Sequence, residues 1–380
     1  METIKKGILI LSPFFSPNIG GTENQLDDLV QELDRHHFKV YVHTYSPLTT
    51  NITWKKYETR GKNIKIWRYA WFGYDLFHKV EKFPLIDFFY LTPYLFIRTF
   101  LWLIFNHQQI DTIHAQGLNA SLIGVVFKYI FRKKLVTSIH AVYEIKPDSV
   151  VAKINGFILN FSDKILATSD LSLKELATFG VVPSKIDVFI PWIDLKLFKP
   201  YDKIQSRKEL GFENKFTVFF LSRLIPKKGA RVLAKVAQKL PQINFVFAGL
   251  GPDEEYLRSQ QKLFLNIKFV GPIINKNTPK YYCMADIYCF PTLYEEGFGK
   301  VLAESLACGT PIVTSNKGAI PKVVDSSVAI LVSPTVQNLK KAILYLYNHP
   351  AELLKLKNNT VKHARKRYGP DNAKLIYRYY

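Results

Sequence analysis

Two glutamates eight residues apart, Glu296 and Glu304, enclose the segment Gly-Phe-Gly-Lys-Val-Leu-Ala. Between Gly299 and Gly309 the sequence has helix-forming spacing, so it predicts a helix that begins directly after the Gly-Phe-Gly turn. The first backbone N–H groups of a helix have no partner within it, and the helix dipole adds partial positive charge there. We therefore expect an anion such as a diphosphate to bind at this turn.

The two carboxylates extend the predicted anion site on either side. Glu296 is expected on the loop above the first helical turn, and Glu304 one turn further along the helix. Carboxylates accept hydrogen bonds from hydroxyl groups, and a nucleotide sugar presents sugar hydroxyls, a diphosphate and ribose hydroxyls in that order. The simpler alternative is that Glu296 only caps the helix and Glu304 is a solvated charge.

Two basic residues, Arg223 and Lys228, follow a predicted strand and precede Gly229 and a predicted helix. Release of a glycosyl group from a nucleotide requires neutralisation of the leaving diphosphate. Metal-dependent transferases use an Asp-x-Asp motif for this, and the chain contains none, so we expect no metal ion. The arginine fork and the lysine point charge are then candidate phosphate ligands. Alternatively both are surface charges, since the chain has 52 lysines and arginines.

Alternating strands and helices are predicted along both halves of the chain. A helix should follow Gly20 and Gly21, where Thr22 and Gln25 have the spacing of a capping box, and another should cover 230–240. This alternation is typical of doubly wound α/β sheets, which bind ligands at the carboxyl ends of their strands. Short apolar runs predict buried strands at 7–11, 39–44, 110–114, 134–140 and 164–168, and then at 217–222, 244–248, 266–270, 287–290, 311–314 and 329–332.

The composition is that of a globular protein with an excess of positive charge. Of the 380 residues, 48% are hydrophobic, which argues against extended disorder, and the formal net charge of +21 favours an anionic partner. Cys283, Cys289 and Cys308 lack metal-ligand spacing and predict buried thiols in a reducing compartment. The apolar run near the N-terminus is too short for a signal peptide, so we expect a cytoplasmic protein.

Residues 70–107 interrupt the alternation with an aromatic, partly basic insertion. Its most apolar part, 84–105, is long enough to span a membrane, but Asp87, Pro93 and Arg98 interrupt it. Three interpretations remain open for this segment. It lies in a membrane interface or lines a lipid-acceptor groove, it forms an ordinary core helix pair, or it spans the bilayer.

The motifs taken together resemble the retaining GT-B glycosyltransferases of the family 4 type, whose nucleotide-sugar site carries an E-x7-E motif. The resemblance covers nearly the whole chain. It rests on the Glu296–Glu304 segment and on pieces that occur in the family's order: Gly20-Gly-Thr-Glu23, Ile113-His-Ala115, Ser138-Ile-His140, Ser222-Arg-Leu-Ile-Pro-Lys-Lys-Gly229, Phe247-Ala-Gly-Leu-Gly-Pro252, Phe269-Val-Gly-Pro272 and Ala285-Asp-Ile-Tyr-Cys-Phe-Pro291.

The resemblance implies an α/β fold of the GT-B type, with two Rossmann-like doubly wound domains that face each other across a cleft. The acceptor-side domain is expected over 1–195 and includes the insertion at 70–107. The nucleotide-sugar-binding domain is expected over 205–365. A helix within 366–380 is expected to cross back to the first domain.

The resemblance also implies roles for residues near the donor sugar. Glu296 is expected to bind sugar hydroxyls together with Gly297 and Phe298, and Glu304 to bind the ribose. His140, at the end of a predicted strand, corresponds to a family histidine that contacts the donor sugar. We therefore interpret Glu296 and His140 as the candidate catalytic residues.

Further roles concern the diphosphate, the base and the acceptor. Arg223 and Lys228 are expected to form the diphosphate-binding pair, assisted by Gly21, Gly299 and Lys300. Near the nucleotide base the resemblance places Gly271 and Ile273, and on the acceptor side Gly20 and Gly21.

Two segments depart from the family pattern. Lys300 stands where an aliphatic residue is common, and its side chain either pairs with Glu304 or adds charge at the phosphates. Ile190-Pro-Trp-Ile-Asp194 replaces the usual Pro-Asn-Gly-Val-Asp, which leaves the shape of that loop open.

The expected function is metal-independent, retaining transfer of a hexosyl unit from a UDP- or GDP-sugar to a lipid-linked or membrane-proximal glycan. Peripheral contact with an anionic membrane at the inner face of the cell membrane is expected with it. One alternative keeps this chemistry with a soluble acceptor such as a sugar phosphate. A non-catalytic nucleic-acid- or membrane-binding protein would explain the charge, but not the two glutamates, and the chain lacks a basic tail, so no nucleic acid is expected.

Overall fold

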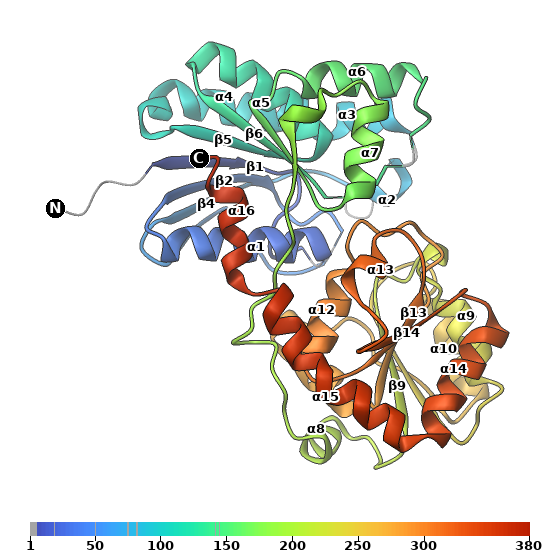
Figure 1. The fold of residues 1–380 in the computed structure, drawn as a ribbon. Coiled ribbons are helices and arrows are strands. Elements are labelled where there is room, and N and C mark those ends of the chain that lie inside the picture. Colours follow the sequence, from blue (N-terminus) through green and yellow to red (C-terminus); the bar gives the residue numbers. More distant parts are fainter. Residues whose placement is uncertain are drawn as a thin grey trace. The chain divides into compact units, whose positions relative to one another are not determined.

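A computed structural model describes residues 6–18, 20–49, 51–73, 76–80, 83–140, 142–143 and 145–380 (Figure 1). The chain divides into two compact units. Unit 1 comprises Met1–Pro191 together with Asp371–Tyr380, and unit 2 comprises Trp192–Pro370. This division falls after Pro191, four residues before the end of the predicted first domain.

Unit 1 contains an eight-stranded sheet with the order β3-β4-β2-β1-β5-β6-β7-β8. The strands from β4 to β8 in this order pair in parallel, and β3 pairs with β4 in antiparallel fashion. The bounds are β1 (Gly7–Leu11), β2 (Lys39–Tyr45), β3 (Tyr57–Arg60), β4 (Ile64–Tyr69), β5 (Thr112–Gln116), β6 (Lys134–Ile139), β7 (Lys164–Ala167) and β8 (Ile186–Val188).

The five strands predicted in this half are all present, although β5 begins two residues later than predicted. Strands β3, β4 and β8 were not predicted. In β4, buried residues alternate with more exposed ones, so this strand lacks the continuous apolar run by which the others were recognised. β3 and β8 are only four and three residues long and lie at the two edges of the sheet.

Helices cover both faces of the unit 1 sheet. Figure 1 shows α4, α5 and α6 on one side of the sheet and α1 and α16 on the other. The bounds are α1 (Gly21–Arg35), α2 (Phe77–Val80), α3 (Pro84–Leu91), α4 (Pro93–Asn106), α5 (Gly117–Phe131), α6 (Val150–Leu159), α7 (Asp170–Thr178) and α16 (Lys374–Tyr377).

The predicted start of α1 is confirmed, but the predicted capping box is wrong. Gly20 is the N-cap residue and no side chain caps the helix. Because the helix already begins at Gly21, Thr22 lies inside its first turn, where its hydroxyl is not in the N-cap position.

The insertion at 70–107 contributes α2, α3 and α4. Among the residues that the structure describes, Ile86–Gln109 is the one helical segment long and apolar enough to cross a membrane, and 33% of its most apolar window is buried. On α4, Leu95, Thr99 and Leu103 are buried within unit 1. One face of this segment therefore packs on the domain, as a core helix would.

Unit 2 contains a six-stranded parallel sheet with the order β11-β10-β9-β12-β13-β14. Every strand predicted in this half is present. The strands are β9 (Thr217–Leu221), β10 (Asn244–Ala248), β11 (Ile267–Phe269), β12 (Ile287–Phe290), β13 (Ile312–Ser315) and β14 (Ala329–Val332). The helices are α8 (Lys203–Leu210), α9 (Ala230–Ala237), α10 (Glu254–Leu263), α11 (Thr278–Met284), α12 (Lys300–Ala307), α13 (Ile320–Val323), α14 (Val336–Asn348) and α15 (Pro350–Arg367).

The C-terminal segment belongs to both units in turn. Helix α15 lies in unit 2, and the chain joins unit 1 from Asp371 onward rather than from 366. In unit 1 the Tyr380 hydroxyl lies 2.6 Å from His114 Nδ1 in β5, and Lys6 Nζ donates to the Tyr380 carbonyl. The last residues thus pack against the first sheet.

The three cysteines are free and buried, as predicted. The thiol of Cys283, in the last turn of α11, donates to the carbonyl oxygen of Cys308 at 3.4 Å. Trp192 and Ile193, from the segment that departs from the family pattern, are buried, and Ile193 belongs to the hydrophobic core of unit 2. The backbone N–H of Ile193 donates to the carbonyl of Tyr368. That segment is therefore a packed connection at the start of unit 2.

Candidate functional site

Two loops of unit 2 lie side by side at the carboxyl ends of β9 and β12. The backbone N–H of Leu293 donates to the carbonyl of Lys227 at 2.7 Å. At Gly229, where φ is +79°, an added Cβ atom would lie 2.1 Å from the carbonyl oxygen of Pro291. Only glycine fits so close an approach, so Gly229 allows the loop that carries Lys228 to meet the loop that carries Glu296.

This approach brings Lys228 and Glu296 together. Lys228 Nζ lies 2.5 Å from Glu296 Oε1, and the two side chains are 9% and 8% exposed. The Thr292 hydroxyl donates to the same carboxylate oxygen at 2.8 Å. Burial lowers the pKa of Lys228, the nearby Arg223 lowers it further, and Glu296 opposes both effects. The site therefore holds a desolvated ion pair, whose electrostatic interactions are stronger than those of a solvated pair.

The backbone around Glu296 is held by the loop after β13. Ala319 N–H donates to the Glu296 carbonyl at 2.8 Å, and Gly318 N–H donates to the Glu295 carboxylate at 2.6 Å. Gly318 has φ +56°, and a Cβ atom there would lie 2.4 Å from the backbone nitrogen of Glu296. Neither Thr292 nor Gly318 was predicted as a site residue. The position of Gly318, shortly after the strand predicted at 311–314, is the sequence feature that could have indicated it.

The predicted start of α12 is confirmed. Gly299 is the N-cap residue with φ +79°, and Lys300 is the first helical residue. Gly297 is buried, and the Phe298 ring makes an edge contact with Tyr368. The helix N-terminus that the sequence predicted as an anion site therefore begins three residues after Glu296.

Glu304 is buried in α12 and accepts a hydrogen bond from the Tyr282 hydroxyl at 3.1 Å. Glu296 is also buried, and it does not cap α12, which has no side-chain cap. The simpler interpretation, in which one glutamate caps the helix and the other is solvated, is therefore wrong.

The remaining predicted donor residues lie on neighbouring loops of the same sheet edge. Arg223 is exposed, and its charge is close enough to lower the pKa of Lys228. Gly249 N–H donates to the carbonyl of Gly271, which joins the loops after β10 and β11. A Cβ atom at Gly271 would meet no atom within 4 Å, whereas the Ile273 side chain belongs to the hydrophobic core. A ligand could therefore contact Ile273 only through its backbone.

In unit 1, Gly20 and Gly21 stand at the start of α1. A Cβ atom at Gly20 would clash with the Glu23 carboxylate at 2.2 Å, whereas one at Gly21 would meet no atom within 4 Å. The first turn of α1 is thus open beside Gly21, as the predicted ligand approach requires.

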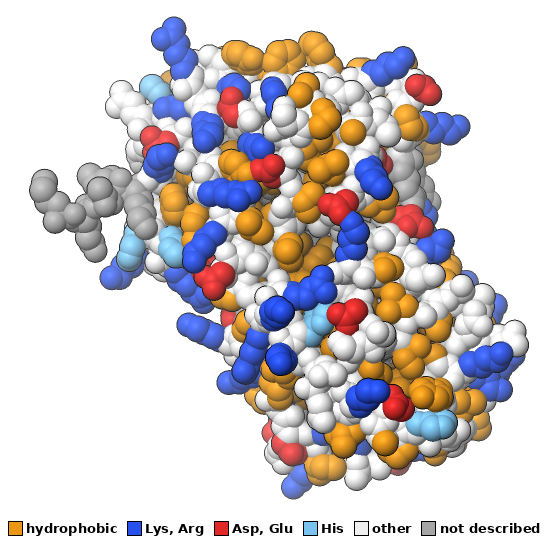
Figure 2. Space-filling model, in the orientation of Figure 1, with side chains coloured by type: hydrophobic (Ala, Val, Ile, Leu, Met, Phe, Trp, Pro, Cys, Tyr) orange, Lys and Arg blue, Asp and Glu red, His pale blue; other side chains and the backbone are white. Residues whose placement is uncertain are grey.

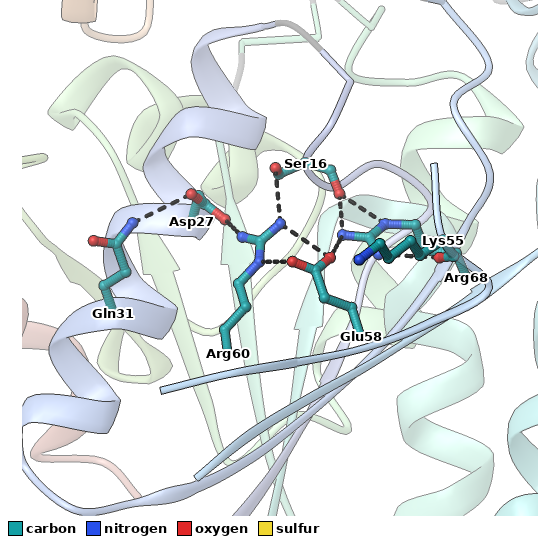
Figure 3. Close-up of polar contacts among 7 residues, drawn as sticks. All are labelled: Ser16, Asp27, Gln31, Lys55, Glu58, Arg60 and Arg68. Carbon is teal, nitrogen blue, oxygen red and sulfur yellow. Dashed lines mark hydrogen bonds and ion pairs between the residues drawn. The ribbon is translucent and has the colours of Figure 1, made fainter. Parts of the chain in front are cut away.

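A partly buried ion network holds the loop that leads to these glycines (Figure 3). Arg68 in β4 is 1% exposed and donates from two nitrogens to the Ser16 carbonyl, at 2.9 and 2.7 Å. Glu58 in β3 pairs with Arg68 at 2.8 Å and with Arg60 at 2.5 Å. Arg60 also pairs with Asp27 in α1. The network ties β3, β4 and α1 to the loop between β1 and α1, and none of its residues was predicted.

His140 lies one residue beyond β6, and its Nε2 is 2.7 Å from Gln116 Oε1 at the end of β5. Because an amide oxygen only accepts, His140 Nε2 carries the proton. Burial lowers the pKa of His140 to about 4, so the imidazole is neutral near pH 7. Gln116 is buried, and its amide nitrogen has no hydrogen-bond partner in the described structure. A polar donor is therefore available beside His140 at this sheet edge.

A cavity of about 400 Å³ lies close to the carboxyl ends of β2 and β4. Its lining combines two indole rings with small polar groups: Ser46, Pro47, Asn51, Ile52, Trp54, Ala70 and Trp71. The Trp71 ring stacks on Tyr45 and on Tyr94 of α4. Among the described residues, no group of three or more His, Cys, Asp or Glu side chains could hold a metal ion.

Two family models match consecutive parts of the chain. The model described as Glycosyltransferase Family 4 matches residues 19–197, and the model described as Glycosyl transferases group 1 matches residues 202–367. The chain belongs to the family 4 glycosyltransferases. The first model covers Gly20, Gly21 and His140, and the second covers Arg223, Lys228 and both glutamates.

Curated relatives of this family 4 glycosyltransferase carry two kinds of name. The D-inositol 3-phosphate glycosyltransferase of a Mycobacterium species is 31% identical over 182 residues, 45% of this chain and 41% of the relative. The match thus spans less than half the length of that relative. The phosphatidylinositol N-acetylglucosaminyltransferase GPI3 subunit of Saccharomyces cerevisiae is 25% identical over 355 residues, 88% of this chain and 75% of the relative.

Solved structures establish the GT-B fold. HepE of Anabaena, in complex with UDP, superposes with a TM-score of 0.74 at 21% identity and covers 97% of both chains. The sucrose-phosphate synthase of Thermosynechococcus elongatus superposes with a TM-score of 0.80 at 20% identity and covers 98% of both chains. The predicted family resemblance and the predicted class of two Rossmann-like domains are therefore confirmed.

Proposed function

We propose that this glycosyltransferase transfers a hexosyl unit from a nucleotide sugar to a lipid-linked or membrane-proximal glycan, with retention of configuration and without a metal ion. The observation that carries the proposal is the buried Lys228–Glu296 pair. Its glutamate lies three residues before Gly299, the N-cap residue of α12. A lysine and a helix N-terminus supply positive charge for the diphosphate, and a carboxylate accepts hydrogen bonds from sugar hydroxyls.

The donor we propose is a UDP-sugar, with a GDP-sugar as the alternative. Structural relatives support this choice, because HepE of Anabaena was solved with UDP and with UDP-glucose. Arg223 and Lys228 neutralise the leaving diphosphate in this proposal, together with backbone N–H groups of Gly299 and Lys300. Glu304 binds the ribose.

The family resemblance supports the proposed retention, with attack from the face that the leaving phosphate vacates and with that phosphate as the base. His140 is neutral near pH 7 and its Nε2 proton is engaged by Gln116. It therefore contacts the donor sugar as a neutral group in this proposal. The unpartnered amide nitrogen of Gln116 supplies a further hydrogen-bond donor next to it.

The acceptor we propose is a lipid-linked or membrane-proximal glycan. The name of the GPI3 relative specifies a phosphatidylinositol acceptor, and the name of the mycobacterial relative specifies a soluble inositol phosphate. We favour a lipid-linked acceptor at the cytoplasmic face of the cell membrane because unit 1 exposes many apolar side chains. The cavity lined by Trp54 and Trp71 suits a saccharide ring, which stacks on indole faces.

A transfer assay with two acceptor classes tests this function. The protein is incubated with radiolabelled UDP- and GDP-sugars and either a membrane lipid extract or a panel of sugar and inositol phosphates, with and without EDTA. The proposal predicts label in the lipid fraction, activity that survives EDTA, and a product whose anomeric configuration by NMR matches that of the donor. Label only in the soluble acceptors would favour the alternative, and loss of activity in EDTA would refute metal independence.

Matched lysine variants connect the activity to the site. Lys228→Met removes the buried charge, whereas Lys227→Met removes a neighbouring charge on the same turn. We expect Lys228→Met to lower kcat/KM at least about a hundredfold, as loss of a preorganised phosphate contact does, and Lys227→Met to change it only slightly.

A further inference from the structure

Three neighbouring helices of unit 1 expose apolar side chains on their outer faces. On α4 the exposed residues Ile97, Leu101, Ile104 and Phe105 follow helical spacing, opposite the buried Leu95, Thr99 and Leu103. Phe105 is 84% exposed. A helix of a soluble domain normally carries polar residues on the face that points away from the core. Helix α4 is apolar on both faces.

Helix α6 repeats this arrangement. Val150, Ile154 and Phe157 lie four and three residues apart on one face, and Val150 and Phe157 are 72% and 67% exposed. The opposite face, with Ala152, Gly156 and Leu159, is buried. Lys153 is exposed beside the apolar stripe.

Helix α5 joins the two stripes into one surface. Phe96 and Phe100 of α4 stack on Phe127 of α5, so α4 and α5 are direct neighbours. Tyr129 and Ile130 of α5 are exposed, and the Tyr129 ring contacts Phe161 just beyond α6. Figure 2 shows this layer on edge, with hydrophobic side chains along the top of the picture between α4 and α6. Contiguous apolar surface of this kind marks a protein or membrane interaction site.

Basic residues accompany the surface. Arg132 and Lys134 are exposed directly after α5, and Lys146 and Lys153 are exposed before and within α6. The chain as a whole carries a formal net charge of +21. This combination of apolar side chains with nearby cations is complementary to a bilayer that contains anionic lipids.

We propose that the outer face of α4, α5 and α6, the docking face, binds the surface of an anionic lipid bilayer, with the helices lying on the membrane rather than spanning it. A spanning arrangement would remove the buried face of α4 from unit 1, including Thr99, whose hydroxyl lies 3.1 Å from His43 Nδ1. This inference deepens the proposed function by naming the surface that contacts the membrane. It rests on the proposed function only in that a lipid-linked acceptor gives the protein a reason to bind a membrane.

Vesicle flotation of the purified full chain tests the docking face. The protein is mixed with phosphatidylcholine vesicles, or with vesicles in which about a third of the lipid is phosphatidylglycerol, and the bound fraction is measured. Two double variants place carboxylates on the face, Leu101→Glu with Phe105→Glu and Ile154→Glu with Phe157→Glu. The matched control, Leu263→Glu with Leu265→Glu, changes two side chains of unit 2 that are 72% and 93% exposed.

The proposal predicts binding to the anionic vesicles, weaker binding to neutral ones, and at least about a tenfold loss of partition for each docking-face variant. The control should bind like the wild type. All variants should keep the wild-type melting temperature and nucleotide-sugar binding, because every substituted residue is exposed and none lies in the donor site. Failure of nucleotide-sugar binding would therefore count against the proposed function alone.

Three results would overturn the docking proposal. One is the absence of wild-type binding to either vesicle, and another is equal binding to neutral and anionic vesicles. The third is self-association of the wild type that the docking-face variants abolish, because the face would then bind a second copy of the chain.

Discussion

Lys228 Nζ and Glu296 Oε1 lie 2.5 Å apart although 68 residues separate them in sequence. The contact exists because Gly229 lets one loop approach the carbonyl of Pro291 in the other. Both side chains were candidate ligands for different parts of a nucleotide sugar, and the structure makes each the partner of the other. Substrate binding at this site would therefore add contacts to a pair that is already oriented.

The pair should be coupled in stability. Lys228→Met leaves a buried carboxylate without its cation, and we expect a loss of about 3 kcal/mol in the free energy of unfolding. Glu296→Gln should cost less, because the lowered pKa of Lys228 eases loss of its proton. The double variant should be more stable than the sum of the two losses predicts, by at least about 1 kcal/mol, in a urea-unfolding cycle. Additive losses would show that the contact contributes nothing.

Gly318→Ala should disturb the Glu296 loop. Its Cβ atom would lie 2.4 Å from the backbone nitrogen of Glu296. Gly211→Ala is the matched control, because Gly211 has φ +75° and open space around its Cβ position. Both substitutions cost about 1 kcal/mol for the left-handed backbone, but only Gly318→Ala should weaken nucleotide-sugar binding, by at least about tenfold. Equal effects in the two variants would remove the argument for the loop contact.

Arg68 should act as a positioning residue for the loop between β1 and α1. Arg68→Lys loses the fork that holds the Ser16 carbonyl, so we expect about 2 kcal/mol of destabilisation and a raised KM for the acceptor. Donor affinity should change less than the acceptor KM, because Arg223, Lys228 and both glutamates lie in unit 2. Arg258→Lys, at an exposed pair with Glu254, should change neither stability nor KM. A loss of stability without any rise in KM would assign Arg68 a structural role only.

Unit 1 should lose stability in mild acid. Burial lowers the pKa of His43 and His114 to about 3 and that of His140 to about 4. In the unfolded chain each ring takes up a proton near pH 6.5, so the unfolded state binds more protons between about pH 6.5 and 4 and stability falls there.

Between pH 7 and 5.5 each of these histidines should contribute about 1 kcal/mol to that loss. Urea unfolding at the two pH values measures the total, and His43→Gln should reduce the pH dependence by one histidine's share. A free energy of unfolding that is equal at pH 7 and 5.5 would contradict the buried neutral state.

The strands whose residues are uniformly apolar were predictable from the sequence, and β1, β10, β12 and β14 match their predicted bounds. A strand buried on both faces has a single simple pattern, which explains this agreement. Strand β4 alternates Ile64 and Ile66 with Lys65 and was missed. The predicted capping box at Thr22 is wrong because Gly20 is the N-cap residue, so Thr22 already lies inside the first turn of α1.

The candidate site was predictable in its parts but not in its contacts. The spacing of Glu296, Gly299 and Glu304 placed a turn before a helix, because both features are local in the chain. The roles of Thr292 and Gly318 arise from loops that meet only after the sheet has formed, as does the hold of Arg68 on Ser16. Single-sequence patterns carry no direct sign of such long-range contacts.

Calorimetric titration of UDP- and GDP-sugars into the wild type, Arg223→Met, Lys228→Met and Lys227→Met tests whether these loops of unit 2 bind the diphosphate of a nucleotide sugar. We expect one nucleotide class to bind with a Kd below about 1 mM, and we expect Arg223→Met and Lys228→Met to weaken binding at least about tenfold while Lys227→Met does not. No binding of any nucleotide sugar at millimolar concentration, or equal binding by all four proteins, would contradict it.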